Sequence, residues 1–91
     1  MSIFGATYSG ISLFGPGKGE NVLDIQDPNG TFVVRELIRK AKEGGGFVRY
    51  QMPASLGEGL YEKISYCLPV PIWNSYVGAG IDLGFVEKNI A

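Results

Sequence analysis

Hydrophobic and polar residues alternate in three stretches of the second half of the chain, at residues 47–52, 61–68 and 75–83. Successive side chains of a strand point to opposite faces, so this alternation predicts three β-strands. Residues 55–59 and 69–74 separate the stretches and are rich in glycine and proline, which favour turns. Neighbouring strands joined by such short links predict an antiparallel meander.

A helix is predicted over residues 31–43, because apolar residues recur there at helical spacing: Val33, Leu37 and Ala41. Either Asp27 or Asn29 could cap its start, and Pro28 would suit the first helical position after Asp27. Three glycines at 44–46 are expected to end the helix, since glycine accepts the left-handed conformation found there.

One more strand is predicted around residues 7–14, and residues 85–91 look like the first turns of a second helix. The order of strand, helix and three strands is typical of the α+β class, with one main helix packed on an antiparallel sheet. This arrangement is similar to PAS-like and profilin-like modules. With 91 residues, the chain is expected to form a single domain.

The composition excludes several classes of function. The chain has no histidine, which removes most acid–base, metal and triad chemistry, so neither an enzyme nor a cofactor is expected. Its one cysteine, Cys67, cannot form an intrachain disulfide and is expected to be a small core residue. A net charge of −1 without a basic patch argues against nucleic acid as a partner.

Residues 78–80 read Gly-Ala-Gly and loosely resemble a dinucleotide-binding loop. Such a loop needs a following helix and an acidic residue about 20 positions further on, and the last residue is Ala91. We therefore expect these glycines to lie in a strand that another group approaches closely.

Aromatic and cationic residues gather on the predicted meander. Walls of aromatic rings with one or two cations suit a small anionic ligand. The alternative interpretation is a solvated face carrying Arg49 with Glu62, or Lys63, above a tyrosine-rich core.

Four segments of the chain together resemble the single Cache domain family. Residues 27–37 carry the pattern D-P-x-G followed by E-L, residues 46–50 read G-F-V-R-Y, residues 62–66 read E-K-I-S-Y, and Trp73 precedes V-G-A-G-I at 77–81. The resemblance runs from about residue 20 to the end of the chain. It implies an extracytoplasmic sensor domain of bacterial or archaeal chemoreceptors (methyl-accepting chemotaxis proteins) and sensor histidine kinases, which binds small molecules, often short carboxylates.

The resemblance also implies roles for individual residues. Lys63 would be the partner of a ligand carboxylate, Tyr50 and Tyr66 would be pocket walls or hydrogen-bond donors, Trp73 would be a rim aromatic, and Arg49 is a further candidate. Strict alternation places Tyr50 and Tyr66 on a face that excludes Lys63. A bulge or a twist could bring the three together.

Family members begin with a long helix and a strand pair, where this chain has only residues 1–19. The chain is therefore expected to be a partial or reduced Cache-like domain, with membrane contact only through segments outside it. A sheet left partly uncovered favours a homodimer. The alternative function is a non-catalytic dimerisation or interaction module without a ligand.

Overall fold

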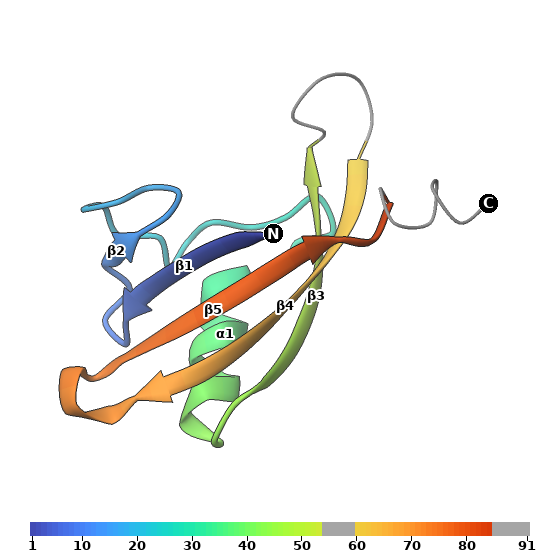
Figure 1. The fold of residues 1–91 in the computed structure, drawn as a ribbon. Coiled ribbons are helices and arrows are strands. Elements are labelled where there is room, and N and C mark those ends of the chain that lie inside the picture. Colours follow the sequence, from blue (N-terminus) through green and yellow to red (C-terminus); the bar gives the residue numbers. More distant parts are fainter. Residues whose placement is uncertain (54–59, 85–91) are drawn as a thin grey trace.

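The computed structural model of the protein describes residues 1–53 and 60–84. In chain order its elements are β1 (Ser2–Thr7), β2 (Ser12–Phe14), α1 (Val33–Lys42), β3 (Gly46–Pro53), β4 (Leu60–Val70), the 3-10 helix η1 (Pro71–Trp73) and β5 (Ser75–Asp82) (Figure 1). The predicted loop at 55–59 and the predicted helix at 85–91 lie outside the described residues. Among the described residues, no helix has the length and apolar character needed to cross a bilayer.

The five strands form one antiparallel sheet in the order β2-β1-β5-β4-β3. Helix α1 covers one face of it, behind β5 and β4 in the view of Figure 1. The predicted α+β class is therefore confirmed, and so is the meander of the last three strands. The N-terminal strand β1 pairs with β5, so the two ends of the described chain lie side by side in the middle of the sheet.

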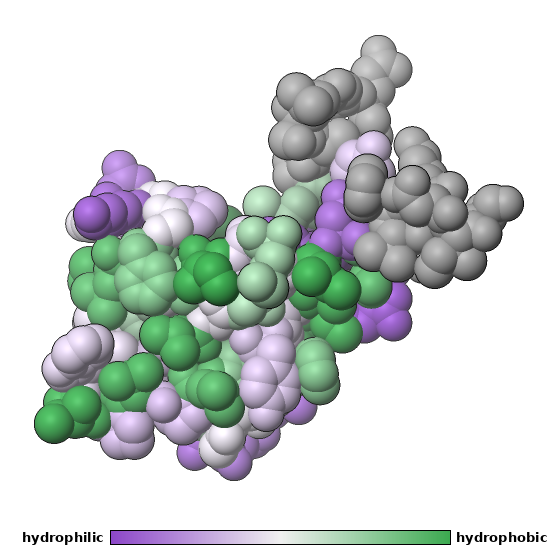
Figure 2. Space-filling view, viewed as in Figure 1, coloured by the Kyte–Doolittle hydropathy of each residue, from purple (hydrophilic) through white to green (hydrophobic). Residues whose placement is uncertain are grey.

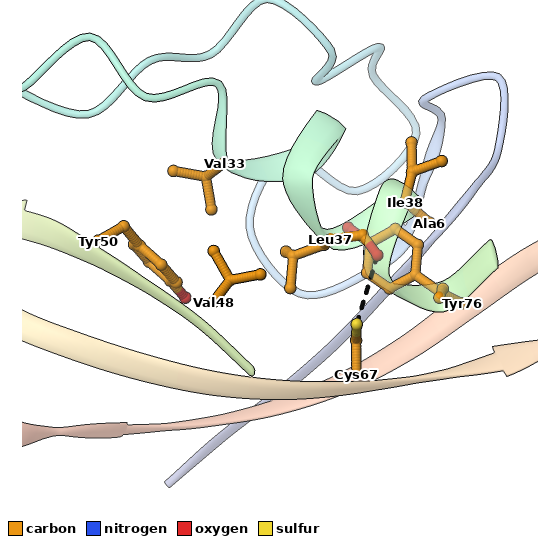
Figure 3. Packing of buried hydrophobic residues seen from close by; sticks show 9 residues of the cluster. Ala6, Val33, Leu37, Ile38, Val48, Tyr50, Cys67 and Tyr76 are labelled. Carbon is orange, nitrogen blue, oxygen red and sulfur yellow. Dashed lines mark hydrogen bonds between the residues drawn. The ribbon is translucent and has the colours of Figure 1, made fainter. Parts of the chain in front are cut away.

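The core lies between α1 and the sheet, as Figure 3 shows. The predicted apolar row of the helix is buried there, with Leu37 2% exposed and Ala41 1% exposed. From the sheet, Cys67 is fully buried and its Sγ donates a hydrogen bond to the Leu37 carbonyl at 3.3 Å. Tyr76 on β5 completes this packing with 2% of its surface exposed. The three glycines end the helix as predicted, with φ of 109° at Gly44.

The prediction of one strand over residues 7–14 is wrong, because β1 ends at Thr7, the chain turns back, and β2 begins at Ser12. The turn between them is closed by a hydrogen bond from the Gly10 amide to the Thr7 carbonyl, at 2.9 Å. Gly10 has a φ of 99°, a conformation that favours glycine. The turn residue therefore splits the apolar stretch that the sequence pattern presents as continuous.

The prediction that Asp27 or Asn29 caps the helix is also wrong. Helix α1 begins at Val33, after Phe32, and no side chain caps its first turn. Asp27 lies in a separate turn, whose backbone closes through a hydrogen bond from the Gly30 amide to the Asp27 carbonyl at 2.9 Å. Residues 27–30 therefore form a turn ahead of the helix.

The sheet face opposite α1 carries apolar side chains that no described segment covers. Figure 2 shows this face, with hydrophobic residues over β1, β5 and β4. Its most exposed apolar members from the strands include Phe47 (61%), Ile3 (55%) and Leu68 (48%). The ring of Phe47 packs edge-on against Tyr66, with centroids 4.6 Å apart. The sheet therefore has one packed face and one bare face.

Candidate ligand-binding site

A cavity of about 150 Å³ lies on the helix side of the sheet. Its walls come from all five strands, from the first half of α1, and from the segment between β2 and α1. Most wall residues are apolar, among them Phe4, Val33, Leu37 and Met52. Polar side chains line it at a few points: Ser2, Ser12, Gln26, Asp27, Tyr50, Lys63 and Tyr76. An apolar chamber with few polar groups is the usual form of a small-molecule site.

Lys63 supplies the positive charge of this cavity. The residue is on β4, yet its ammonium reaches β1, where it donates a hydrogen bond to the Ser2 hydroxyl over 2.7 Å. Its strand partner in β5 is Asp82, which is on the same face. No other cationic side chain lines the cavity among the described residues.

Tyr50 enters the cavity from the edge strand β3. Its hydroxyl shares a 2.7 Å hydrogen bond with the Ser65 hydroxyl, and both residues are buried. Burial raises the pKa of Tyr50, and the hydrogen bond to Ser65 partly opposes that rise. The phenol is therefore held neutral and in a fixed position beside the cavity.

Asp27 contributes a carboxylate to the cavity wall, and both of its oxygens accept hydrogen bonds from backbone amides. Oδ1 accepts from the amides of Asn29 and Thr31, each at 2.9 Å, and Oδ2 accepts from the amide of Gln51 on β3 at 3.0 Å. These hydrogen bonds hold the pKa of Asp27 below its ordinary value, and the bond from the Gln51 amide has the largest effect. Asp27 thus ties the turn before α1 to the sheet and stays ionised.

Tyr76 is a cavity residue that the sequence reasoning did not select. Its ring packs edge-on to Phe4, with centroids 6.5 Å apart. Burial, followed by the proximity of Cys67 and Tyr50, raises the pKa of its hydroxyl. The only signal available in the sequence was its position two residues before the Gly-Ala-Gly motif, on the same face of the predicted strand.

The other three candidates lie outside this cavity. Arg49 is on the bare face, where its guanidinium pairs with Glu62 at 2.8 Å, as the alternative interpretation expected. Tyr66 is on the same face against Phe47. Trp73 is in η1 and is 70% exposed.

The expectation that Tyr50 and Tyr66 share a face that excludes Lys63 is wrong. In the β3–β4 register, Tyr50 stands opposite Lys63 and Phe47 stands opposite Tyr66. Residues opposite one another across antiparallel strands share a face. Tyr50 and Lys63 therefore meet without any bulge, and Tyr66 points away from both.

The described part of the chain holds no group of three or more acidic or cysteine side chains that could bind a metal ion. Cys67 is fully buried, and burial raises the pKa of its thiol, which disfavours the reactive thiolate. The cavity offers a ligand one cation, several hydroxyls and apolar walls.

Comparison with known proteins shows the family of this chain. The profile of a family described as Cache domain matches residues 2–87. The chain belongs to the Cache domain family. The match starts at β1, whereas the motifs recognisable in the sequence start near residue 20. Strands β1 and β2 are thus part of the family pattern.

Two curated proteins are similar to this Cache domain in sequence. Over 73 residues it is 33% identical to the methyl-accepting chemotaxis protein CtpM of Pseudomonas aeruginosa, covering 79% of this chain and 13% of that protein. Over 80 residues it is 34% identical to the sensor histidine kinase MctS of Rhizobium johnstonii, covering 84% of this chain and 17% of that protein. The relatives are sensory proteins, and the chain spans under a fifth of their length.

Solved structures share the fold. A methyl-accepting chemotaxis protein of Vibrio parahaemolyticus superimposes with a TM-score of 0.80 at 24% identity, covering 92% of this chain and 60% of the other. A periplasmic sensor domain of a chemotaxis protein gives a TM-score of 0.79 at 24% identity, covering 89% and 60%. A Cache chemosensory domain, solved to explain carboxylic acid recognition, gives 0.79 at 23% identity, covering 89% and 58%. The Cache domains of chemoreceptors and sensor kinases are extracytoplasmic.

Proposed function

We propose that this Cache domain is the non-enzymatic, ligand-binding part of a transmembrane receptor, and that its ligand is a short monocarboxylate. The observation that carries the proposal is the placement of one ammonium group, that of Lys63, in an otherwise mostly apolar chamber. A carboxylate would accept from Lys63 and from the adjacent Ser2 hydroxyl. Its hydrocarbon part would contact Phe4, Leu37 and Met52.

The size of the chamber favours a small ligand. A volume of about 150 Å³ corresponds to roughly five waters at liquid density, or to a molecule of about six non-hydrogen atoms. The charges limit it further, because a dicarboxylate would need a second cation. An amino acid would need a free acceptor for its ammonium group, and the oxygens of Asp27 already accept from three backbone amides.

The neighbouring Cache chemosensory domain described for carboxylic acid recognition supports the same ligand class. The chemotaxis and kinase relatives support a receptor whose sensor domain lies outside the cytoplasm. Binding would shift the domain toward the conformation that holds the carboxylate better. Membrane segments elsewhere in the receptor would pass that shift on.

Isothermal titration calorimetry with propionate tests the proposal, with propionamide as the uncharged isostere and ionic strength matched. A charge-assisted hydrogen bond contributes about 1.5–3 kcal/mol, so Lys63→Met is expected to weaken propionate binding roughly tenfold or more. A thermal-shift series gives a second readout, because a ligand that binds only the native state raises the melting temperature.

Arg49→Gln is the matched control, since it also removes one positive charge, but from the bare face. Tyr66→Phe and Trp73→Ala test the two other sequence-selected residues, which lie away from the cavity. We expect all three variants to bind propionate like the parent domain. Equal binding of propionate and propionamide, or no binding of either, would contradict the carboxylate proposal.

A second function, a homodimerisation or interaction module, is favoured by the bare face. Its exposed apolar side chains include Phe47, Leu68, Ile81 and Ile3, and contiguous apolar surface on a folded domain marks contact sites. Arg49 and Glu62 on this face form an ion pair, so their charges offset one another. We propose a second copy of the chain as its occupant.

Light scattering coupled to size exclusion, over a hundredfold range of protein concentration, tests the dimer. Phe47→Lys combined with Leu68→Lys is expected to give a monomer, and Ile72→Lys, an exposed apolar residue in η1, is the control. A parent domain that stays monomeric throughout would rule out the second copy. Dimerisation without carboxylate binding would favour the interaction module over the sensor.

A further inference from the structure

The Gly-Ala-Gly motif at 78–80 lies in β5, the central strand of the sheet, with β1 on one side and β4 on the other. Gly78 stands opposite Phe4 on β1, and Gly80 stands opposite Ser2 on β1 and Ser65 on β4. Neither glycine has a positive φ, so their backbone conformation does not require glycine. Glycine at these positions therefore matters because neighbouring groups fill the space that a side chain would occupy.

The space over Gly80 is occupied by the side chain of Lys63. A Cβ built on Gly80 would lie 2.9 Å from Cε of Lys63 and would clash with Oγ of Ser65. Lys63 thus crosses β5 directly above Gly80 before its ammonium reaches Ser2 on β1. Because Gly80 has no side chain, a space remains above the central strand β5, which we call the passage. Lys63 of β4 extends through this passage, so that its ammonium group lies beside β1.

The same position controls a second polar group of the cavity. Ser65, which the added Cβ would meet, holds the Tyr50 hydroxyl at 2.7 Å. A methyl group at 80 would therefore press on both the lysine stem and the serine that orients Tyr50. Gly78 differs, because the three atoms nearest to a Cβ there would all belong to the Phe4 ring, with Cε2 at 2.5 Å.

We infer that Gly80 is a positioning residue for anion recognition: it opens the passage that places the Lys63 ammonium beside Ser2 in the cavity. The inference rests on the proposed function and assigns to the second glycine of the motif a role in ligand binding. Gly78 has a separate role, which is to admit the Phe4 ring to the apolar wall.

A double-mutant cycle tests the inference, with propionate binding measured by calorimetry. Gly80→Ala is expected to weaken binding roughly tenfold while Lys63 is present, because the charged hydrogen bond is lost. In the Lys63→Met background the same change is expected to weaken binding clearly less, because only its pressure on Ser65 and Tyr50 remains. Gly78→Ala is the matched control, and any effect it has is expected to be equal in both backgrounds. A Gly80→Ala effect that is also equal in both backgrounds would overturn the inference, and so would wild-type affinity in Gly80→Ala.

Two further measurements cover the other outcomes. If Gly80→Ala does not fold, Ser2→Ala removes the hydroxyl that accepts from the Lys63 ammonium without adding volume. It is expected to weaken binding more in the parent domain than in the Lys63→Met background, and an equal effect in both would overturn the placement of Lys63. If the parent domain binds no carboxylate, the proposed function fails, yet the position of Lys63 can still be measured. The ¹³Cε resonance of Lys63 is then expected to shift in Gly80→Ala and not in Gly78→Ala, and an unchanged resonance would reject the passage.

Discussion

Tyr50 and Lys63 stand directly opposite one another on β3 and β4 and project from the same face of the sheet. This pairing puts a phenol and an ammonium into one cavity beneath α1. It also places Arg49 and Tyr66 on the opposite face. Arg49 directly precedes Tyr50, and Tyr66 belongs to the same E-K-I-S-Y motif as Lys63. The pairing therefore brings two of the five sequence-selected residues into one cavity, and the other three lie outside it.

The Tyr50–Ser65 hydrogen bond is expected to contribute to stability. Tyr50→Phe leaves the buried Ser65 hydroxyl without this partner and should lower the free energy of unfolding by about 1 kcal/mol. Urea denaturation at neutral pH measures it. Tyr66→Phe is the control, because Tyr66 is 40% exposed on the bare face. Equal losses in the two variants would mean that the buried bond adds nothing.

Asp27 is expected to make stability depend on acid. Its pKa is lowered in the folded state, chiefly by the Gln51 amide. The resulting stabilisation is present above the unfolded-state value of about 4 and is lost as the pH falls toward the folded-state pKa. Asp27→Asn should therefore lower the urea midpoint at pH 7, and the difference from the parent domain should shrink near pH 3.

Asp24→Asn is the control for that experiment, since Asp24 forms an ion pair with Arg35 while its own side chain is 90% exposed. Exposed pairs contribute little, so its urea midpoint should stay close to the parent value at every pH. A constant difference between Asp27→Asn and the parent from pH 7 to pH 3 would contradict the linkage to the Asp27 carboxyl.

Alkaline pH is expected to destabilise the domain through its buried tyrosines. Burial raises the pKa of Tyr50 and of Tyr76 in the folded state. Above the unfolded-state value of about 10, the unfolded chain loses protons that the native state keeps, so stability falls as the pH rises. In an absorbance titration of the five tyrosines, part of the phenolate signal should appear only together with unfolding.

The matched variant for the alkaline experiment is Tyr76→Phe. It should delay alkaline unfolding to higher pH, because one proton-retaining group is removed from the native state. Reversible titration of all the tyrosines in a protein that keeps its folded circular dichroism spectrum would contradict the assignment.

Cys67 is expected to be inert in the native domain. It is fully buried and its Sγ donates to the Leu37 carbonyl, so a thiol reagent can reach it only when the structure opens. Labelling at neutral pH should be slow in buffer and complete, at one thiol per chain, in concentrated urea. Rapid labelling of the folded domain would show that the core between α1 and β4 opens locally.

Much of the architecture was predictable from short-range patterns. The row of Leu37 and Ala41, and the glycines after it, predicted α1 to within two residues at its start and one at its end. The alternation in the last three strands predicted the meander. These features depend on periods of 3.6 residues in the helix and 2 residues in the strands, and both periods are visible in the sequence itself.

The N-terminal part was harder, because its structure depends on partners far along the chain. The apolar stretch around Gly10 does not reveal that it turns back, and β1 finds its place only by pairing with β5. Asp27 has the chemistry of a helix cap, yet its carboxylate binds the amide of Gln51, 24 residues away. Capping rules consider only residues close in sequence, so they do not include the distant amide of Gln51.

The sequence by itself determined the α+β class, the helix, the meander and the lack of histidine chemistry. It also indicated a sensor family. Each of these follows from composition or from the spacing of nearby residues. Only the tertiary structure decided which side chains meet. Register sets Tyr50 against Lys63, and strand order brings Ser2 within 2.7 Å of an ammonium 61 residues away. Register and strand order are chosen by the packing of the whole sheet against α1, a balance that no single segment contains.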